Sequence, residues 1–124
     1  MTTKVLVIVE DEPDMRLLVR VMLAADPRFE LIGEAASARD AITLAEAAAP
    51  GLVVLDHTLE GDLTGLMAAP LLKAASPGSK IILFSAHDLA AAARDEPAVD
   101  AFVPKTDIGK LLATAQRLVG LDSG

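Results

Sequence analysis

The order of hydrophobic and amphipathic segments predicts an α/β fold, a three-layer sandwich around a parallel central sheet. Five short apolar runs alternate with five segments whose apolar residues recur at helical spacing. This alternation is typical of parallel sheets covered by helices on both faces. The chain has 124 residues, and its sequence contains no internal repeat and no low-complexity linker. We therefore expect residues 1–124 to form a single domain.

The apolar runs give the expected strands. The first run is continuous and rich in β-branched residues and leucine, which is typical of a strand buried on both faces. The third is short and wholly apolar, and the fourth follows an unambiguous turn at residues 76–79. In chain order, the expected strands cover residues 4–9, 29–34, 52–55, 80–85 and 99–103.

Start and stop signals delimit the first two expected helices. Pro13 opens a helix whose apolar residues keep helical spacing until Asp26 and Pro27 end it. Ser37, followed three positions later by Asp40, resembles a capping box and begins an alanine-rich helix over residues 37–48.

Three further helices are expected in the second half. The third begins near Thr64 or Gly65 and runs to residue 75, and Pro70 within it predicts a late start or a kink. The segment 88–94 is short and alanine-rich, so its helix depends on tertiary support. The last helix, over residues 108–119, has the clearest apolar stripe.

Four of the apolar runs stop at residues that can handle a phosphoryl group or its metal ion. These residues are Glu10 with Asp11, Asp56, Ser85 and Lys105. Parallel strands joined by right-handed crossovers end at one rim of a sheet. The sequence therefore predicts one acidic pocket that contains one lysine and one hydroxyl group.

Clustered carboxylates raise one another's pKa unless a cation shares the site. Mg²⁺ fits this pocket because it prefers oxygen ligands and leaves positions free for phosphate oxygens. A zinc site is disfavoured, because the chain has no cysteine and only two histidines, His57 and His87. A carboxylate beside Mg²⁺ can attack a phosphoryl donor, and Asp56, at the end of the expected central strand, is the better candidate nucleophile.

Charge and hydropathy limit the partners. The net charge of −7 and the pI near 4.6 argue against nucleic-acid binding through this domain. The apolar run at residues 5–9 is far too short to span a membrane, and no signal peptide is visible. We expect a cytoplasmic protein without membrane contact.

At these residues the sequence resembles a known family, the receiver domains of two-component response regulators. The strings KVLVIVEDEPDMR, LVVLDHTL, IILFSAHD and AFVPKTD carry the resemblance, in the family's order and close to its spacings, over essentially the whole chain. The resemblance implies the flavodoxin-like fold, with five parallel strands in the order 2-1-3-4-5 and five helices.

The resemblance also implies a metal site. Asp56 would be the phosphoacceptor, and Asp11 and Asp56 would bind Mg²⁺ directly. Glu10 would bind it mostly through water, and the backbone carbonyl of Thr58 would complete the shell. The loop over residues 59–65 departs from the common family pattern by one inserted residue, so its conformation is left open.

Further roles follow from the same resemblance. Ser85 and Lys105 would contact the phosphoryl group, and Phe102 matches the aromatic switch position. Isolated histidines in loops are most often exposed to solvent and have no functional role. The alternative hypothesis is that Thr58 and His87 control the access of water to the acyl phosphate and so set its lifetime.

The sequence thus predicts a phosphoacceptor switch. A histidine kinase or a histidine phosphotransfer protein would donate the phosphoryl group to Asp56, and the affinity for an unknown target protein would change. Its only catalysis would be Mg²⁺-dependent self-phosphorylation and self-dephosphorylation.

One alternative is a phosphorylation-independent pseudo-receiver that serves as an interaction module. Another is an Mg²⁺-dependent phosphatase, which would need an acid at position 58, where the chain has Thr58. The kinase, the target, the phosphoryl lifetime, the oligomeric state and whether the chain was cut from a longer protein are left open.

Overall fold

Helices and strands alternate along the chain in the computed structural model, which describes residues 3–10 and 12–121. In chain order the elements are β1 (Thr3–Val9), α1 (Pro13–Ala24), β2 (Phe29–Ala35), α2 (Ala38–Ala48), β3 (Leu52–Leu55), α3 (Gly65–Ala75), β4 (Lys80–Ser85), α4 (Ala90–Asp95), β5 (Ala101–Pro104), a 3-10 helix (Lys105–Lys110) and α5 (Leu111–Leu118). The predicted α/β class, with five α-helices within these residues, is confirmed.

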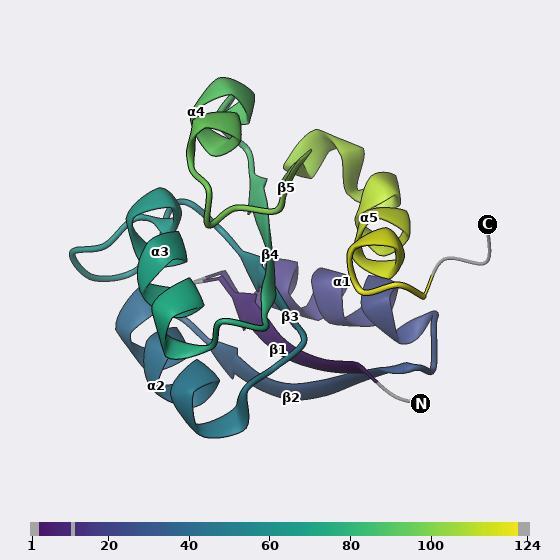
Figure 1. Ribbon diagram of the computed structural model, residues 1–124. Helices are drawn as coiled ribbons and strands as arrows, with labels where there is room; N and C mark the ends of the chain where they lie inside the picture. The colour runs from purple at the N-terminus through teal and green to yellow at the C-terminus, as the bar shows by residue number, and fades with distance from the viewer. Residues whose placement is uncertain (1–2, 11, 122–124) are drawn as a thin grey trace.

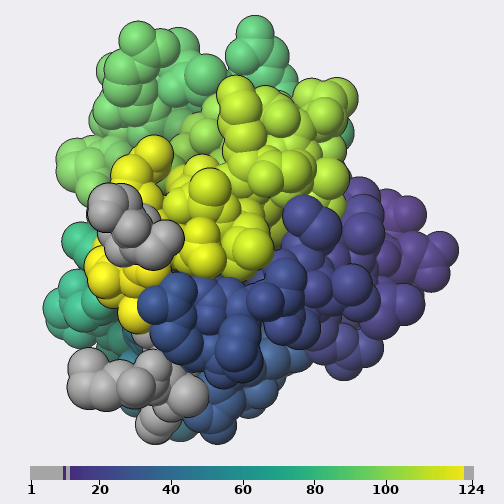
Figure 2. Space-filling model, turned by 90° about the vertical axis from the view of Figure 1, so that its right-hand side faces the viewer, coloured from purple at the N-terminus to yellow at the C-terminus, as the bar shows by residue number. Residues whose placement is uncertain are grey.

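The strands form one sheet in the order β2-β1-β3-β4-β5, and all neighbouring pairs are parallel. Helices α2 and α3 cover one face, whereas α1 and α5 cover the other, and α4 lies beside β5 (Figure 1). Figure 2 looks onto the α1 and α5 side, where the blue-purple and yellow segments are next to each other. This arrangement brings the carboxyl ends of all strands to one edge of the sheet.

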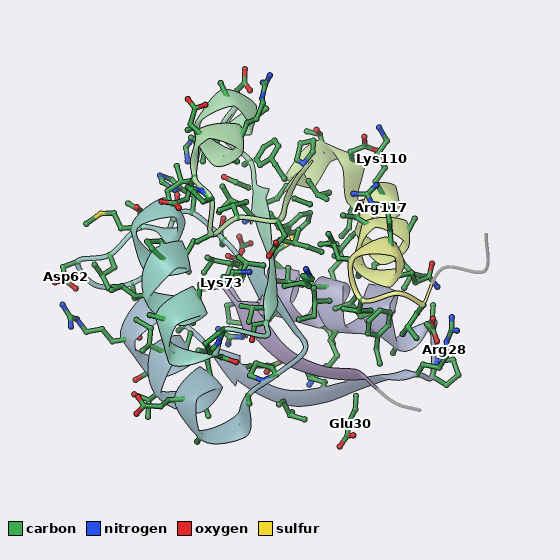
Figure 3. The ribbon with its side chains drawn as sticks, viewed as in Figure 1. Arg28, Glu30, Asp62, Lys73, Lys110 and Arg117 are labelled. Atoms are coloured by element: carbon green, nitrogen blue, oxygen red, sulfur yellow. The ribbon has the colours of Figure 1, made fainter. Side chains whose placement is uncertain are left out.

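The core is made of aliphatic side chains. Strand β3 is buried throughout, and β4 is buried after its first residue, because helices cover both faces of these strands. The largest fully buried side chains are Leu52, Leu55, Leu72, Ile81, Ile82, Leu83 and Leu111. Lys73 holds α3 to the lower end of β4 by donating to the Ser79 carbonyl and to the Asp100 carboxylate, both at 2.7 Å (Figure 3).

Helix starts follow the predicted capping signals. The Ser37 side chain accepts the backbone N–H of Asp40 at 3.3 Å and caps α2. In the same way Thr64 caps α3 by accepting the N–H of Met67. Helix α3 continues through Pro70, so of the two expectations the late start is wrong, and the kink stays a prediction. The Thr64 cap and the buried inner face of the helix offset the hydrogen bond that proline cannot make.

Two boundaries in the second half also differ from expectation. Strand β5 begins at Ala101, because Val99 lies in a turn where its N–H bonds to the Glu96 carbonyl at 3.0 Å. Helix α5 begins at Leu111, because the non-helical backbone of Asp107 confines the preceding residues to a 3-10 helix. Ile108 still packs against the core from this 3-10 segment.

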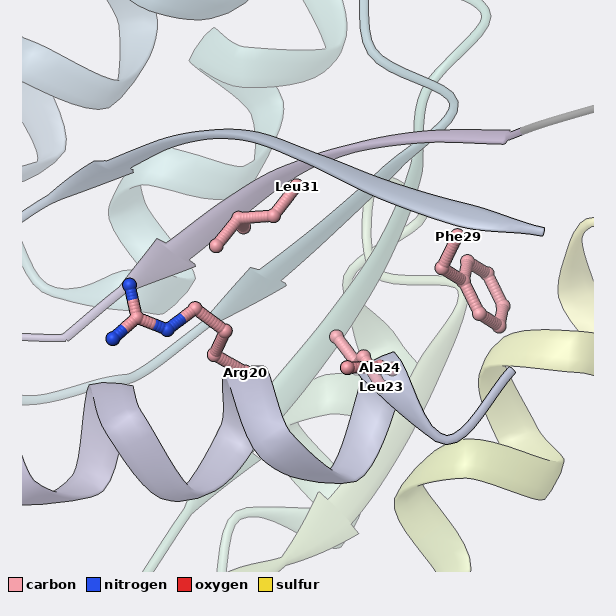
Figure 4. A pocket seen from close by; sticks show the side chains of 5 residues that line it. All are labelled: Arg20, Leu23, Ala24, Phe29 and Leu31. Atoms are coloured by element: carbon pink, nitrogen blue, oxygen red, sulfur yellow. The ribbon is translucent and has the colours of Figure 1, made fainter. Parts of the chain in front are cut away.

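A small cavity of about 70 Å³ lies between α1 and β2, lined by Arg20, Leu23, Ala24, Phe29 and Leu31 (Figure 4). It lies beside the start of β2, away from the strand ends that carry polar residues.

Within the described ranges, no helix combines the length and the apolar character needed to cross a bilayer.

Candidate functional site

Side chains from the start, the middle and the end of the chain meet at the carboxyl edge of the sheet. Lys105 Nζ lies 2.8 Å from Glu10 Oε1 and 3.2 Å from Asp56 Oδ2, although 95 positions separate Lys105 from Glu10. The side chains of Lys105, Glu10 and Asp56 are only 15%, 4% and 6% exposed. We call these three side chains the carboxylate pocket.

The register of the sheet builds this pocket. Val9 at the end of β1 pairs with Leu55 at the end of β3. The next residues, Glu10 and Asp56, therefore leave the sheet at the same level and on neighbouring strands. The Glu10 N–H bonds to the Ala35 carbonyl at 3.0 Å, which holds its backbone beside β2.

The Asp56 carboxylate is held by the backbone of the next residue as well as by Lys105. Its Oδ1 accepts the N–H of His57 at 2.8 Å. Gly65, the first residue of α3, lies against the Asp56 peptide: a side chain there would overlap the Asp56 carbonyl and come within 2.8 Å of His57 Cα. This contact was not predicted from the sequence, because glycine is common at helix starts and so gives no local signal of a close backbone contact.

Ser85 ends β4 at the same edge. It pairs with Pro104, the residue before Lys105, and it is fully buried. Its Oγ accepts the N–H of His87 at 3.1 Å, so the hydroxyl group lies at the start of the loop after β4.

Phe102 is half-buried on β5 and lines two hollows. One, of about 450 Å³, also contacts His87 and Pro104. The other, of about 230 Å³, lies between α4 and β5. Phe102 therefore borders open space on two sides, and its predicted role as a switch residue stays a prediction.

Burial and charge shift two pKa values in the carboxylate pocket. Burial, and then the neighbouring Asp56 carboxyl group, raise the pKa of Glu10 from its usual 4.5 to about 8, against the opposing effect of Lys105. Burial alone would lower the pKa of Lys105, but its contacts with Glu10 and Asp56 outweigh this effect, so its pKa is raised. Glu10 Oε2 is buried and has no hydrogen-bond partner in the described part of the chain. Among the described residues, one amine therefore serves two buried carboxylates, and one carboxylate oxygen is left without a donor.

The family profile described as "Response regulator receiver domain" matches residues 6–116 of this sequence. The chain belongs to this family of receiver domains. Receiver domains are signalling switches of two-component systems: they accept a phosphoryl group, typically bind Mg²⁺, and interact with histidine kinases and downstream targets. The resemblance inferred from the sequence is therefore confirmed.

Curated relatives are longer than this receiver domain. It is 30% identical over 119 residues to the response regulator protein VraR of Staphylococcus aureus (strain Mu3 / ATCC 700698). The match covers 94% of this chain and 56% of VraR, so the chain spans about half the length of the curated relatives it matches.

Solved structures share the fold. A two-component response regulator of the LuxR family from Aurantimonas sp. SI85-9A1 superposes with a TM-score of 0.87 at 26% identity, over 97% of this receiver domain and 86% of that chain. The response regulator domain of Thermotoga maritima CheB superposes with a TM-score of 0.83 at 19% identity, over 98% of this chain and 99% of its own. At that identity the second match shows the fold alone.

The structure describes only some of the predicted metal ligands of the receiver domain. Glu10 and Asp56 face the same Lys105 amine, whereas Asp11 lies outside the described residues. Among the side chains that the structure describes, no group of three or more acids or histidines is spaced for a metal ion. The magnesium ligands therefore stay a prediction.

Two histidines lie next to the carboxylate pocket. The rings of His57 and His87 are edge-on, with centroids 6.2 Å apart and planes at 77°. Thr58 Oγ1 lies 3.2 Å from His87 Nε2, so the loops after β3 and β4 are linked. Burial, and then the neighbouring His87, lower the pKa of His57. The predicted roles of Thr58 and His87 in phosphoryl lifetime stay predictions.

The loop over residues 59–65, whose conformation the sequence left open, is attached to the start of α2. Glu60 forms a parallel bridge with Ser37, and its N–H bonds to the Ala36 carbonyl at 3.3 Å. Arg39 and Asp62 form a two-point ion pair at the surface, with a shortest distance of 2.8 Å. Asp62 is labelled in Figure 3 at the outer end of this loop.

Proposed function

We propose that this receiver domain accepts a phosphoryl group on Asp56 from the phosphohistidine of a histidine kinase or a histidine phosphotransfer protein. The observation that carries the proposal is the contact of Lys105 with both buried carboxylates, Glu10 and Asp56. A carboxylate nucleophile beside a fixed amine is the arrangement that phosphoryl transfer to an aspartate needs.

The transfer exchanges one bond to phosphorus for another. An Asp56 carboxylate oxygen attacks the phosphorus atom, and the bond from phosphorus to the imidazole nitrogen breaks. The electron pair returns to that nitrogen, which takes a proton from solvent. The Lys105 ammonium group, 3.2 Å from Asp56 Oδ2, neutralises charge on the phosphoryl oxygens, and the Ser85 hydroxyl group donates to one of them.

Glu10, Asp11, Asp56 and the backbone carbonyl of Thr58 would hold Mg²⁺. The buried Oε2 of Glu10, which has no partner among the side chains that the structure describes, and the raised pKa of that carboxyl group support a cation in this pocket. When bound, Mg²⁺ supplies positive charge that lowers the repulsion between the carboxylates and the incoming phosphoryl group.

Phosphorylation would act as a switch by adding a charge of about −2 at Asp56. This charge attracts Lys105 and the Ser85 hydroxyl group, and Phe102 moves in response. The hollows of about 450 and 230 Å³ beside Phe102 support such a movement. A target protein that binds the two arrangements differently reads the change as a shift in populations.

The acceptor is tested by intact-mass measurement after incubation with Mg²⁺ and acetyl phosphate. We expect the wild type to gain one phosphoryl mass and Asp56→Asn to gain none. A gain in both proteins would place the acceptor elsewhere. No gain in the wild type would favour the alternative of a phosphorylation-independent interaction module.

Two further variants test the switch and the lifetime. Lys105→Ala should still accept a phosphoryl group but lose the coupling of phosphorylation to the environment of Phe102, measured by NMR. The lifetime of the acyl phosphate should change when Thr58 and His87 are both replaced by alanine. An unchanged lifetime would remove that role from both residues.

A further inference from the structure

One residue joins the Asp56 carboxylate to the first turn of α3. The backbone N–H of His57 donates to Asp56 Oδ1 at 2.8 Å, and its carbonyl accepts the N–H of Gly65 at 2.8 Å. Its ring Nδ1 accepts the N–H of Leu66 at 3.4 Å. His57 therefore holds the carboxylate through its backbone and holds the helix through both its backbone and its side chain.

The start of α3 depends on these contacts. The first N–H groups of a helix have no partner within the helix and must find one outside it. His57 accepts those of Gly65 and Leu66, whereas Thr64 accepts the next two, from Met67 through its side chain and from Ala68 through its carbonyl. The ring of His57 thus adds a second side-chain acceptor at the start of α3, beside the usual threonine cap at Thr64.

The helix start is also fixed in space. Gly65 lies so close to the Asp56 carbonyl that even a methyl group would not fit between them. A change in the position of the 56–57 peptide therefore moves the first turn of α3, and the reverse also holds. The orientation of the carboxylate and the position of the helix are coupled through the two residues 56 and 57.

We propose that His57 is a positioning residue for phosphoryl transfer: by accepting the Leu66 N–H on Nδ1, it fixes the peptide whose N–H orients the Asp56 carboxylate. With Oδ1 held by that N–H and Oδ2 facing Lys105, the carboxylate keeps one orientation. A fixed nucleophile reacts faster than one that rotates, because fewer of its orientations are unproductive. This inference rests on the proposed role of Asp56 as phosphoacceptor.

Four variants separate the acceptor nitrogen from the other properties of the ring. His57→Asn places an acceptor oxygen as many bonds from Cα as Nδ1, but it removes the ring that packs against His87. His57→Leu keeps an apolar side chain and has no acceptor, and His57→Gln moves the acceptor one bond further out. Thr64→Ala is the matched control, because it removes the cap on Met67 and leaves residue 57 unchanged.

Two measurements test the proposal. One is amide hydrogen exchange at Leu66 in the unphosphorylated protein, and the other is the initial rate of phosphoryl gain with Mg²⁺ and acetyl phosphate. His57→Leu should raise the exchange rate and lower the phosphorylation rate, each by about tenfold, which is the effect of one hydrogen bond. His57→Asn should keep both within about twofold of the wild type. Thr64→Ala should raise exchange at Met67 without slowing phosphorylation.

The outcomes are distinct. If His57→Asn behaves like His57→Leu, ring packing rather than the Nδ1 acceptor matters, and the proposal is overturned. It is also overturned if His57→Leu is phosphorylated at the wild-type rate. If His57→Leu does not fold, His57→Gln should show the same loss in both measurements, and wild-type rates there would overturn the proposal. A wild type that gains no phosphoryl group refutes the function of Asp56, and this inference with it.

Discussion

Two buried carboxylates at opposite ends of the sheet show opposite electrostatics. Asp26, in the turn between α1 and β2, accepts the backbone N–H and the guanidinium of Arg28 and the amide of Gln116, at 2.7–3.2 Å. Hydrogen bonds to Arg28 and Gln116 hold its pKa well below the usual 3.8. Glu10 at the other end bonds to Lys105 through Oε1, but its Oε2 has no partner among residues 3–10 and 12–121, and its pKa is raised to about 8.

The difference lies in the balance between burial and hydrogen-bond donors: burial is the largest influence on the pKa of Glu10, whereas hydrogen bonds are the largest influence on the pKa of Asp26. Asp26, Arg28 and Gln116, which we call the Asp26 cluster, satisfy the carboxylate and tie the turn to α5. Arg28 Nη2 also donates to the Leu121 carbonyl at 3.0 Å, close to the end of the described chain (Figure 3). The cluster is therefore structural. A carboxylate that is buried with too few donors marks a site able to take up a cation or another ligand.

The largest difference in stability between the two regions should come from replacing the basic side chain in each of them. Lys105→Met should lower the free energy of unfolding at pH 8 by about 3 kcal/mol, because two buried carboxylates lose their partner. Arg28→Met should cost less, because Asp26 keeps Gln116 and the backbone N–H of residue 28, and the arginine side chain is 45% exposed. Urea denaturation measures both values. Adding Glu10→Gln to Lys105→Met should restore part of the loss, whereas a larger cost for Arg28→Met would refute the comparison.

The carboxylate pocket also depends on a backbone contact that the Asp26 cluster lacks. Gly65→Ala places a methyl group against the Asp56 carbonyl, so either α3 or the Asp56 peptide must move. We expect a loss of about 2 kcal/mol in the free energy of unfolding. Gly78→Ala is the control, because a methyl group there meets nothing within 4 Å. Equal effects of the two substitutions in urea denaturation would argue against a tight contact at Gly65.

The pH dependence of stability should have opposite signs in the two regions. Between pH 4.5 and about 8 the folded protein keeps a proton on Glu10 that the unfolded chain has released, so this group's contribution falls as pH rises. The contribution of Asp26, whose folded pKa lies below 3.8, is complete above pH 3.8 and is lost as pH falls through its folded pKa.

Isosteric variants check these signs by urea denaturation across pH in the presence of a chelator. Glu10→Gln should remove the decline above pH 4.5, and Asp26→Asn should weaken the acid-side loss. When Mg²⁺ replaces the chelator, the decline in the free energy of unfolding above pH 4.5 should become smaller in the wild type. In Glu10→Gln, Mg²⁺ should have little effect on the pH dependence. A decline that persists in Glu10→Gln would assign it to another group.

The smallest effect should come from the surface pair between Arg39 and Asp62. Both side chains are more than half exposed, at 69% and 67%, so solvent and salt screen their attraction. Arg39→Ala should change the midpoint of thermal unfolding less than any substitution above. If Arg39→Ala lowers the midpoint of thermal unfolding as much as Lys105→Met does in the same measurement, the contact of the loop with α2 contributes more to stability than its exposure implies.

Much of the candidate site follows from local sequence patterns. Glu10, Asp56, Ser85 and Lys105 were singled out because each follows or ends an apolar run, and parallel strands end at a common edge. The capping role of Ser37 likewise follows from short-range chemistry and is observed in the structure. These predictions depend only on neighbouring residues and on general rules of chain topology.

Other features could not be predicted because they depend on distances between separate segments. The contact of Gly65 with the Asp56 peptide requires the register of α3 against β3. The use of His57 Nδ1 as a helix cap requires the same register. Of the late start or kink expected at Pro70, the late start was wrong, because packing of the buried face of α3 outweighed a local preference.

The amino-acid sequence alone determined the α/β class and the residues at the strand ends, because hydrophobic periodicity and chain connectivity are local or topological properties. Only the tertiary structure decided which carboxylate, Asp26 or Glu10, finds donors for both of its oxygens within the described part of the chain. That outcome depends on how many donors from distant segments come within hydrogen-bond distance, and differences of about 1 Å in packing control it.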